Sequence, residues 1–323
     1  MRISLLAASL CFVIIDLNTP AFAQSCAPGQ WKQVPVASEF RGKKARTQLS
    51  GAACNGGNSQ CLVVNDETEF AQLFSISGGK IVPGRKIELT PEDDEPDAEA
   101  AIFKDGSFFV VGSHGKSRRN DKPNDASYIV MRVDPATGVT ARSTRWRNAI
   151  FGSDLRDYAG QKLTGGGPDG NGGINVEGAA IWGDRMYLGL RGPSIGTRAH
   201  LLHAALRDVF DQAGPPLSAT TEPIELGPRT GIRDLAAVKS GLLILSGPVT
   251  DEQVVPAVFF WNPADKTTRK LVDLPGLSAG WKAETLVALD PDETGDPHNH
   301  RVMLIFEGPA NGDPVECLIP KAR

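Results

Sequence analysis

The chain has 323 residues, with 34 Lys and Arg against 38 Asp and Glu, and a formal net charge of −4 at pH 7. This mildly acidic balance, without a block of basic residues, excludes the electrostatic footprint of a nucleic-acid-binding protein. The 35 glycines and 23 prolines, together with only 7% aromatic residues, indicate many turns and few long helices.

The first 23 residues have the pattern of a secretory signal peptide. Arg2 precedes an apolar stretch over residues 3–15, which is shorter than the roughly 20 residues that span a bilayer. Ala21-Phe22-Ala23 then supplies the small-x-small pattern that signal peptidase cleaves. We expect cleavage before Gln24 and export of residues 24–323 to the periplasm or the extracellular space, as a monomer without a membrane span. A single anchoring helix is the alternative.

Four cysteines remain in the expected mature chain, and an even number in an exported protein predicts disulfides with three possible pairings. Cys54 and Cys61 flank a turn rich in Gly and Asn, whereas Cys26 and Cys317 lie near the two ends of the mature chain. We therefore expect the pairs Cys54–Cys61 and Cys26–Cys317. A zinc site is the alternative, but the chain lacks the paired CxxC spacing of such sites.

Five segments share a pattern that recurs at intervals of 49, 78, 57 and 50 residues. Each begins with small residues around one polar or acidic position and continues into a hairpin with an apolar run. The repeat positions are Ser50, Glu99, Glu177, Asp234 and Glu284. Such a period is typical of the four-stranded blades of a β-propeller.

Further strands are predicted between the repeats, at residues 128–133, 200–204 and 257–261. The longest interval contains an insertion at about residues 145–173, within which residues 154–159 form a short helical candidate. The pattern predicts an all-β fold, a single-domain β-propeller of five or six blades over residues 24–323. A β-sandwich is the alternative, although it would not explain the recurring acidic position.

We expect the acidic side chains of the repeat to gather at one end of the ring, because the first strand of each propeller blade lines the central channel. Carboxylates that gather there repel one another and need a cation or a basic partner. A hard cation such as Ca²⁺ is one solution, and its candidate ligands are Glu99, Glu177, Asp234 and Glu284. Neutralisation by arginines is a second solution. In a third, the acids only accept hydrogen bonds from the neighbouring blade.

The second strand of each blade returns to the same end, where its last residues form the channel mouth. The candidate ligand-binding residues there are Asp66, His114, Arg191, Arg233 and Glu307. Arg191 and Arg233 are also the arginines that would neutralise the carboxylates.

Two other sequence patterns predict no site, and a third leaves one alternative open. Residues 192–196 match G-x-S-x-G, but they join two strand candidates instead of a strand and a helix. Residues 165–173 are rich in glycine but lack the G-K-[ST] of a phosphate-binding loop. Residues 290–296 begin like an EF-hand loop, but Arg301 stands where a bidentate Glu is required, which excludes an EF-hand and leaves a hairpin loop that binds Ca²⁺ less regularly as the alternative.

The chain resembles an uncharacterised bacterial family, the DUF3616 proteins, over residues 45–310. The most distinctive matching strings are Gly231-Ile-Arg-Asp-Leu-Ala-Ala237 and Leu245-Ser-Gly-Pro248. The resemblance implies a propeller-like fold without an established activity. The chain also looks distantly similar to phytase-like esterase propellers, which would imply Ca²⁺ and a phosphate ester. It departs from them because it has no dense Lys/Arg cluster to hold a polyphosphate, and from DUF3616 at Ala100, where glycine is usual.

Three functions follow from these observations. The first is an exported propeller that binds a small molecule or an envelope protein at the channel mouth. The second is a Ca²⁺-assisted hydrolase of an ester, lactone or phosphoester, in which the ion activates water and His114 is the general base. The third is a structural envelope protein.

Overall fold

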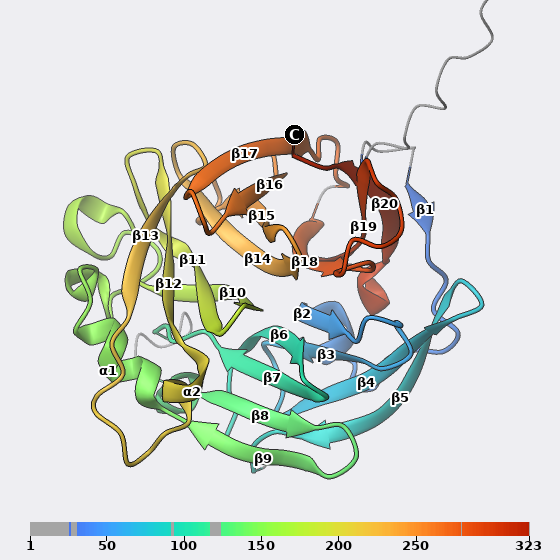
Figure 1. Ribbon diagram of the computed structural model, residues 1–323, viewed down its shortest axis with the longest axis horizontal. Coiled ribbons are helices and arrows are strands. Elements are labelled where there is room, and N and C mark those ends of the chain that lie inside the picture. Colours follow the sequence, from blue (N-terminus) through green and yellow to red (C-terminus); the bar gives the residue numbers. More distant parts are fainter. Residues whose placement is uncertain (1–25, 27–30, 92–93, 117–123, 279, 323) are drawn as a thin grey trace, which may run out of the picture.

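Five antiparallel sheets of four strands each surround a central axis in the computed structural model (Figure 1). The structure describes residue 26 and residues 31–91, 94–116, 124–278 and 280–322. The arrangement is a β-propeller, so the predicted all-β fold is confirmed, with five blades as the number. The predicted signal peptide lies outside the described residues.

Each blade begins with its innermost strand and proceeds outward. Blade one consists of β2 (Leu49–Cys54), β3 (Cys61–Asn65), β4 (Phe70–Ser77) and β5 (Lys80–Glu88). Blade two consists of β6 (Ala98–Lys104), β7 (Ser107–Gly112), β8 (Val130–Asp134) and β9 (Gly138–Ser143). Blade three consists of β10 (Asn175–Trp182), β11 (Arg185–Ile195), β12 (Arg198–Ala205) and β13 (Thr220–Glu225). Blade four consists of β14 (Thr230–Val238), β15 (Gly241–Pro248), β16 (Ala257–Asn262) and β17 (Thr267–Asp273). Blade five consists of β18 (Lys282–Ala288), β19 (Asn299–Glu307), β20 (Val315–Pro320) and β1 (Lys32–Gln33).

The two ends of the chain close the ring together. The short strand β1 pairs with β20 as the outermost strand of blade five, with Lys32 opposite Glu316. Beside this pair, a disulfide joins Cys26 to Cys317. The second disulfide joins Cys54 to Cys61, so both predicted pairings are confirmed. Two disulfides are consistent with an oxidising compartment.

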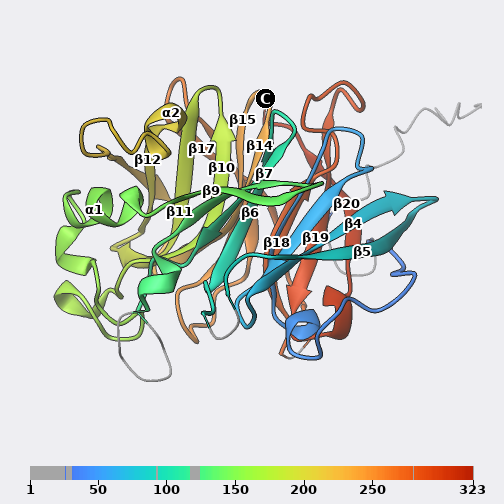
Figure 2. The same ribbon diagram turned by 90° about the horizontal axis from the view of Figure 1, so that it is seen from below.

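The hydrophobic core is divided into five clusters, one between each pair of neighbouring blades. Successive side chains of a strand enter different clusters: on β15, Leu242 and Ile244 pack towards blade three, whereas Leu243 and Leu245 pack towards blade five. Because both faces of each sheet are buried, the strands appear in the sequence as continuous apolar runs instead of an alternation. Figure 2 shows the sheets from the side.

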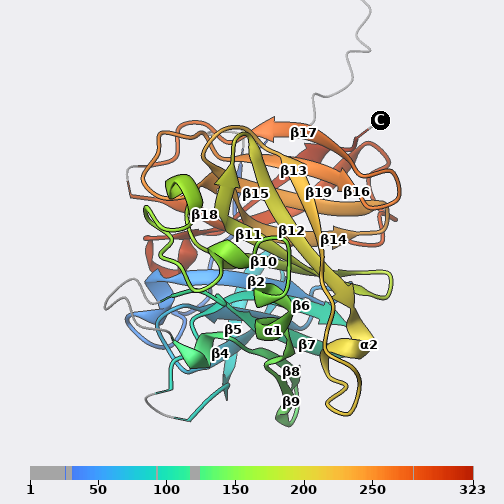
Figure 3. The same cartoon turned by 90° about the vertical axis from the view of Figure 1, so that its left-hand side faces the viewer.

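The insertion between blades two and three begins with the helix α1 (Arg145–Phe151), which lies on the side of the ring that Figure 3 faces. Trp146 and Ile150 of α1 pack into the cluster between blades two and three. The predicted helix at residues 154–159 is only a single 3₁₀ turn at Arg156–Tyr158. The other α-helix among the described residues, α2 (Leu206–Val209), follows β12. Within the described part of the chain, no helix has the length and apolar character needed to cross a membrane.

Candidate functional site

The repeated polar position is a β-bulge in every blade. In β10, Val176 pairs with Leu190 and Gly178 with Gly189, which leaves Glu177 out of the ladder. The same register shift occurs once in the innermost strand of each other blade. The bulged residues are Ser50, Glu99, Glu177, Arg233 and Glu284. A bulge turns its residue out of the pleat, which is why these side chains gather at one end of the channel.

Blade four departs from the predicted alignment by one residue. Its bulged residue is Arg233, whereas Asp234 occupies the position that Gly178 has in blade three. Asp234 accepts hydrogen bonds from the backbone N–H of Leu235 and, across the blade boundary, from that of Leu286, both at 2.7 Å. Burial raises the pKa of Asp234 well above its usual value, although these two N–H groups act in the opposite direction. Asp234 therefore links two blades and does not line the cavity at this end.

Two arginines occupy the centre of the bulged residues. Arg233 Nε lies 2.9 Å from Glu177 Oε2 and 2.7 Å from Glu284 Oε2, and Arg191 Nη1 lies 2.6 Å from Glu177 Oε1. All four side chains are at most 7% exposed. This network of Glu177, Arg191, Arg233 and Glu284, here called the charged plug, joins blades three, four and five. It has the form expected if arginines neutralise the carboxylates.

Burial and pairing act against each other in the charged plug. Burial disfavours the charge of Arg233, but Glu177 and Glu284 outweigh it and raise the pKa of Arg233 above its ordinary value. Burial raises the pKa of Glu284 to about 7, while Arg233 opposes that rise and Glu177 adds to it. Removal of one partner from the charged plug would therefore leave a buried charge without compensation and destabilise the folded protein.

The remaining candidate metal ligand, Glu99, has different neighbours. Its carboxylate lies with those of Asp66 and Asp97, and one oxygen of each falls within 4.8 Å of the others. The hydroxyl of Ser113 also donates a hydrogen bond to Asp97. Asp97 was not among the metal ligands predicted from the sequence, although it stands only two positions before Glu99.

His114 lies away from the channel mouth. It is fully buried, its ring contacts Tyr128 edge-on at 5.7 Å between centroids, and neither ring nitrogen has a hydrogen-bond partner among the described residues. Burial lowers the pKa of His114 to about 3, so its ring is neutral at pH 7. Glu307, by contrast, does reach the mouth, where Lys282 Nζ lies 2.9 Å from its carboxylate.

The predicted mouth is almost closed. The cavity there, the bulge-end cavity, is lined by all five bulged residues and has a volume of about 10 Å³, which is room for roughly one water molecule. Ser50 contributes to the closure because its Oγ donates a 2.6 Å hydrogen bond to the carbonyl of Ala98 in the next blade. A larger ligand does not fit at this end without displacement of the charged plug.

The opposite end of the channel holds a cavity of about 550 Å³, here called the channel cavity. It is lined by all five innermost strands and the turns that follow them, at residues 52–54, 101–105, 179–183, 235–239 and 286–288. These strands each form one edge of a sheet and surround the axis (Figure 1). Their inward edges therefore present backbone N–H and C=O groups that pair with no other strand of the described residues.

Small side chains and a polar rim shape the channel cavity. Alanines such as Ala53, Ala237 and Ala288 keep the wall close to the backbone, while Trp182 stands near the rim and donates a 3.3 Å hydrogen bond to the carbonyl of Lys239. The rim charges are Lys104, Asp105, Lys239 and Asp292, which sum to zero. This cavity was not predicted from the sequence, because its wall consists of alanine side chains and backbone, which carry no residue-type signal.

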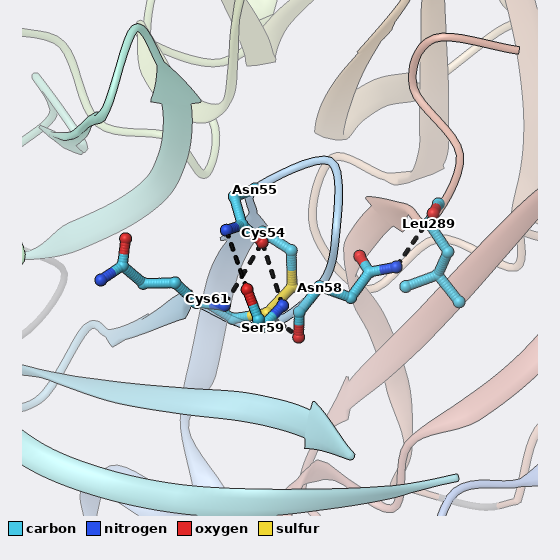
Figure 4. Close-up of a disulfide and its surroundings, with 7 residues drawn as sticks. Cys54, Asn55, Asn58, Ser59, Cys61 and Leu289 are labelled. Carbon is cyan, nitrogen blue, oxygen red and sulfur yellow. Dashed lines mark hydrogen bonds between the residues drawn. A yellow bond between two sulfur atoms is a disulfide. The ribbon is translucent and has the colours of Figure 1, made fainter. Parts of the chain in front are cut away.

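The Cys54–Cys61 disulfide fixes one sector of this rim (Figure 4). Beyond it, the turn is held by Asn55, whose side chain contacts Ser59, and by Asn58, whose Nδ2 donates a 3.0 Å hydrogen bond to the carbonyl of Leu289 in blade five. The disulfide and the Asn55–Ser59 contacts hold the turn within blade one, and the bond from Asn58 joins this turn to blade five at the entrance.

Part of the chain matches a protein family of unknown function. Residues 166–311 match the family described as "Protein of unknown function (DUF3616)". The predicted resemblance to DUF3616 is confirmed for these residues, whereas residues 45–165 of the predicted range lie outside the match. The matched range covers blades three and four and most of blade five. No curated protein matches the chain.

The solved structures that the chain matches belong to proteins with different functions. A luciferin-regenerating enzyme shares 11% identity at a TM-score of 0.45, over 90% of this chain and 80% of that one. A calcium-binding protein, regucalcin from Agrobacterium tumefaciens, shares 12% identity at a TM-score of 0.42, over 90% and 97%. Hydrazine synthase from Kuenenia stuttgartiensis shares 9% identity at a TM-score of 0.40, over 83% of this chain and 65% of that one, less than two thirds of its length. Similarities this low carry no argument about function.

Proposed function

We propose that this protein is an exported propeller that binds a small organic molecule in the channel cavity. The observation that carries the proposal is the cavity itself, because 550 Å³ falls within the range of about 300–1,000 Å³ typical of ligand sites. Closure of the far end by the charged plug makes it a pocket with one entrance instead of a pore. The two disulfides support export.

The walls define the chemistry of the ligand. Unpaired strand edges offer both donors and acceptors, so a molecule with hydrogen-bonding groups along its body would satisfy them. The alanine wall favours a slender molecule, and Trp182 offers one aromatic surface near the entrance. Because the rim charges sum to zero, a neutral or zwitterionic molecule suits the site better than a polyanion.

Occlusion of the channel should abolish binding. We expect that a compound from a metabolite library that raises the melting temperature of the wild-type protein will have no effect on Ala237→Phe, because the added ring occupies the cavity. Ala237 is half-buried on β14, and the exposed Ala136 in the β8–β9 turn provides the matched control Ala136→Phe. The measurement is thermal unfolding with and without each compound. An equal shift in wild type and Ala237→Phe would place the ligand elsewhere.

A second candidate is a Ca²⁺-assisted hydrolase, favoured by the carboxylates of Asp66, Asp97 and Glu99 within 4.8 Å of one another. Oxygen atoms that share a Ca²⁺ ion at about 2.3–2.6 Å can lie up to roughly 5 Å apart, so the group fits such an ion. When bound, Ca²⁺ would polarise an ester or phosphoester and promote attack by water. Because His114 is fully buried, the proposed reaction would take its general base from another group.

Metal analysis distinguishes this candidate from the first. If Ca²⁺ binds here, mass spectrometry of the purified protein should find about one Ca²⁺ per chain, lost after EDTA and strongly reduced in Glu99→Gln. Glu88→Gln, at an exposed site on β5, should keep the ion. Absence of Ca²⁺ from the wild-type protein after dialysis against the ion would rule out the hydrolase candidate. It would not affect the proposal that the channel cavity binds a ligand.

A further inference from the structure

The connection between blades two and three is much longer than the others. It runs over residues 144–174, whereas the connections that enter blades two, four and five occupy only residues 89–97, 226–229 and 274–281. Closure of the ring does not require this length, since the shorter connections make the same step from an outermost to an innermost strand. Long connections inside a compact domain commonly serve a function of their own.

The glycine-rich end of this connection encloses a third cavity. Together with the end of β11 and the loops before β14 and after β15, it surrounds about 250 Å³, here called the loop cavity. The polar residues that line the loop cavity are Asp169, Asn171, Ser194, Arg229, Thr250 and Glu252. Gly172 adopts a φ of +92°, and a side chain there would meet the carbonyl of Leu163, so the wall needs glycine at this point.

Ser194 has a hydroxyl group with unmet hydrogen-bonding capacity. The residue is 6% exposed and lines the loop cavity, yet its Oγ has no hydrogen-bond partner among the described residues. Its backbone N–H is occupied by the carbonyl of Asn171 at 3.2 Å. A buried hydroxyl without a partner destabilises a protein, unless a bound molecule completes its hydrogen bonds.

Glu252 is a second residue of the lining whose side chain is held in place. The backbone N–H and hydroxyl of Thr250 donate to its two carboxylate oxygens at 2.6 and 2.9 Å. Burial acts to raise the pKa of Glu252, but these bonds and the charge of Arg229 lower it below its usual value. The carboxylate is therefore ionised and oriented before any ligand arrives.

We infer that the loop cavity binds a neutral polyhydroxylated molecule of monosaccharide size. Its lining mixes acceptors (Asp169, Glu252), donors (Arg229) and a free hydroxyl (Ser194), and sugar hydroxyls can satisfy both kinds of group. Two carboxylates beside one guanidinium do not suit a phosphate or another polyanion. This site is separate from the channel cavity, which has none of these lining residues.

Calorimetric titration of the full chain with D-glucose, N-acetyl-D-glucosamine, D-glucuronate and myo-inositol tests the inference. At least one of the neutral three should bind the wild-type protein, and Ser194→Ala and Glu252→Gln should each weaken that binding by about tenfold or more. Ser77→Ala and Glu225→Gln, at exposed positions on β4 and β13, are matched controls and should bind as wild type does.

Three results would overturn the inference: no binding of any neutral probe at tens of millimolar, equal binding in Ser194→Ala and Glu252→Gln, or preference for glucuronate. Far-UV circular dichroism establishes that each variant is folded before titration. Ala237→Phe should retain the binding, which separates this site from the channel cavity.

Discussion

Removal of the closing disulfide, by Cys26→Ser together with Cys317→Ser, should lower the free energy of unfolding by about 5–6 kcal/mol. The reason is that the two residues are 291 positions apart, so the bond restricts a very large loop in the unfolded chain. The strand that closes the ring, β1, has only two residues and contributes few ladder hydrogen bonds of its own. Urea unfolding monitored by circular dichroism measures the change.

The second disulfide is the internal control for this prediction. Cys54 and Cys61 are 7 positions apart, so the same chain-entropy relation gives only about 2 kcal/mol for Cys54→Ser with Cys61→Ser. A loss in the Cys26/Cys317 variant that is no greater than that in the Cys54/Cys61 variant would show that the ring closes without help from its disulfide.

Arg233→Met should destabilise the protein by about 3–5 kcal/mol, because it leaves Glu284 buried without its cation. The exposed pair of Arg198 and Glu225 provides the matched control, and Arg198→Met should cost at most about 1 kcal/mol. The double variant Arg233→Met with Glu284→Gln should recover part of the loss, since it removes the uncompensated charge. Equal effects of Arg233→Met and Arg198→Met would refute a buried, energetically coupled plug.

The loss in Arg233→Met should also depend on pH. Burial already raises the pKa of Glu284 to about 7, and removal of Arg233 should raise it further. A carboxyl group with a raised pKa in the folded state stabilises the protein below its ordinary pKa of 4.5, and this contribution is lost as the pH rises through the folded value. The destabilisation of Arg233→Met should therefore be smaller at pH 5 than at pH 8.

The fold could be predicted because its determinants are local and repeated. The apolar run of β3 buries Leu62 and Val64 against blade two and Val63 against blade five, and each blade repeats this arrangement. The helix at Arg145–Phe151 was also visible in principle, because Trp146, Ala149 and Ile150 have the spacing of one helical face. The predicted helix at residues 154–159 has the same spacing at Leu155, Tyr158 and Ala159, and Leu155 and Ala159 are buried in the same cluster, but the segment forms only one 3₁₀ turn.

The site could be predicted only in part, because a β-bulge shifts the pairing register by one residue and so changes which side chain faces the channel end. Alignment by acidic residue type selected Asp234, whereas alignment by the apolar neighbour Ile232 would have selected Arg233. Closure of the mouth depends on Arg191, which reaches Glu177 from the partner strand β11, and no one-dimensional pattern records such a cross-strand contact. The burial of His114 likewise results from tertiary packing around Tyr128.

Crystallographic fragment screening of the wild-type protein tests the central claim, a ligand site in the channel cavity, most directly. We predict that fragments will bind inside the ring against the strand edges near Ala237 and Trp182, with the charged plug unchanged beneath them. Fragments that bind instead among Glu99, Glu177 and Glu284, with the plug displaced and the channel cavity empty, would contradict the claim.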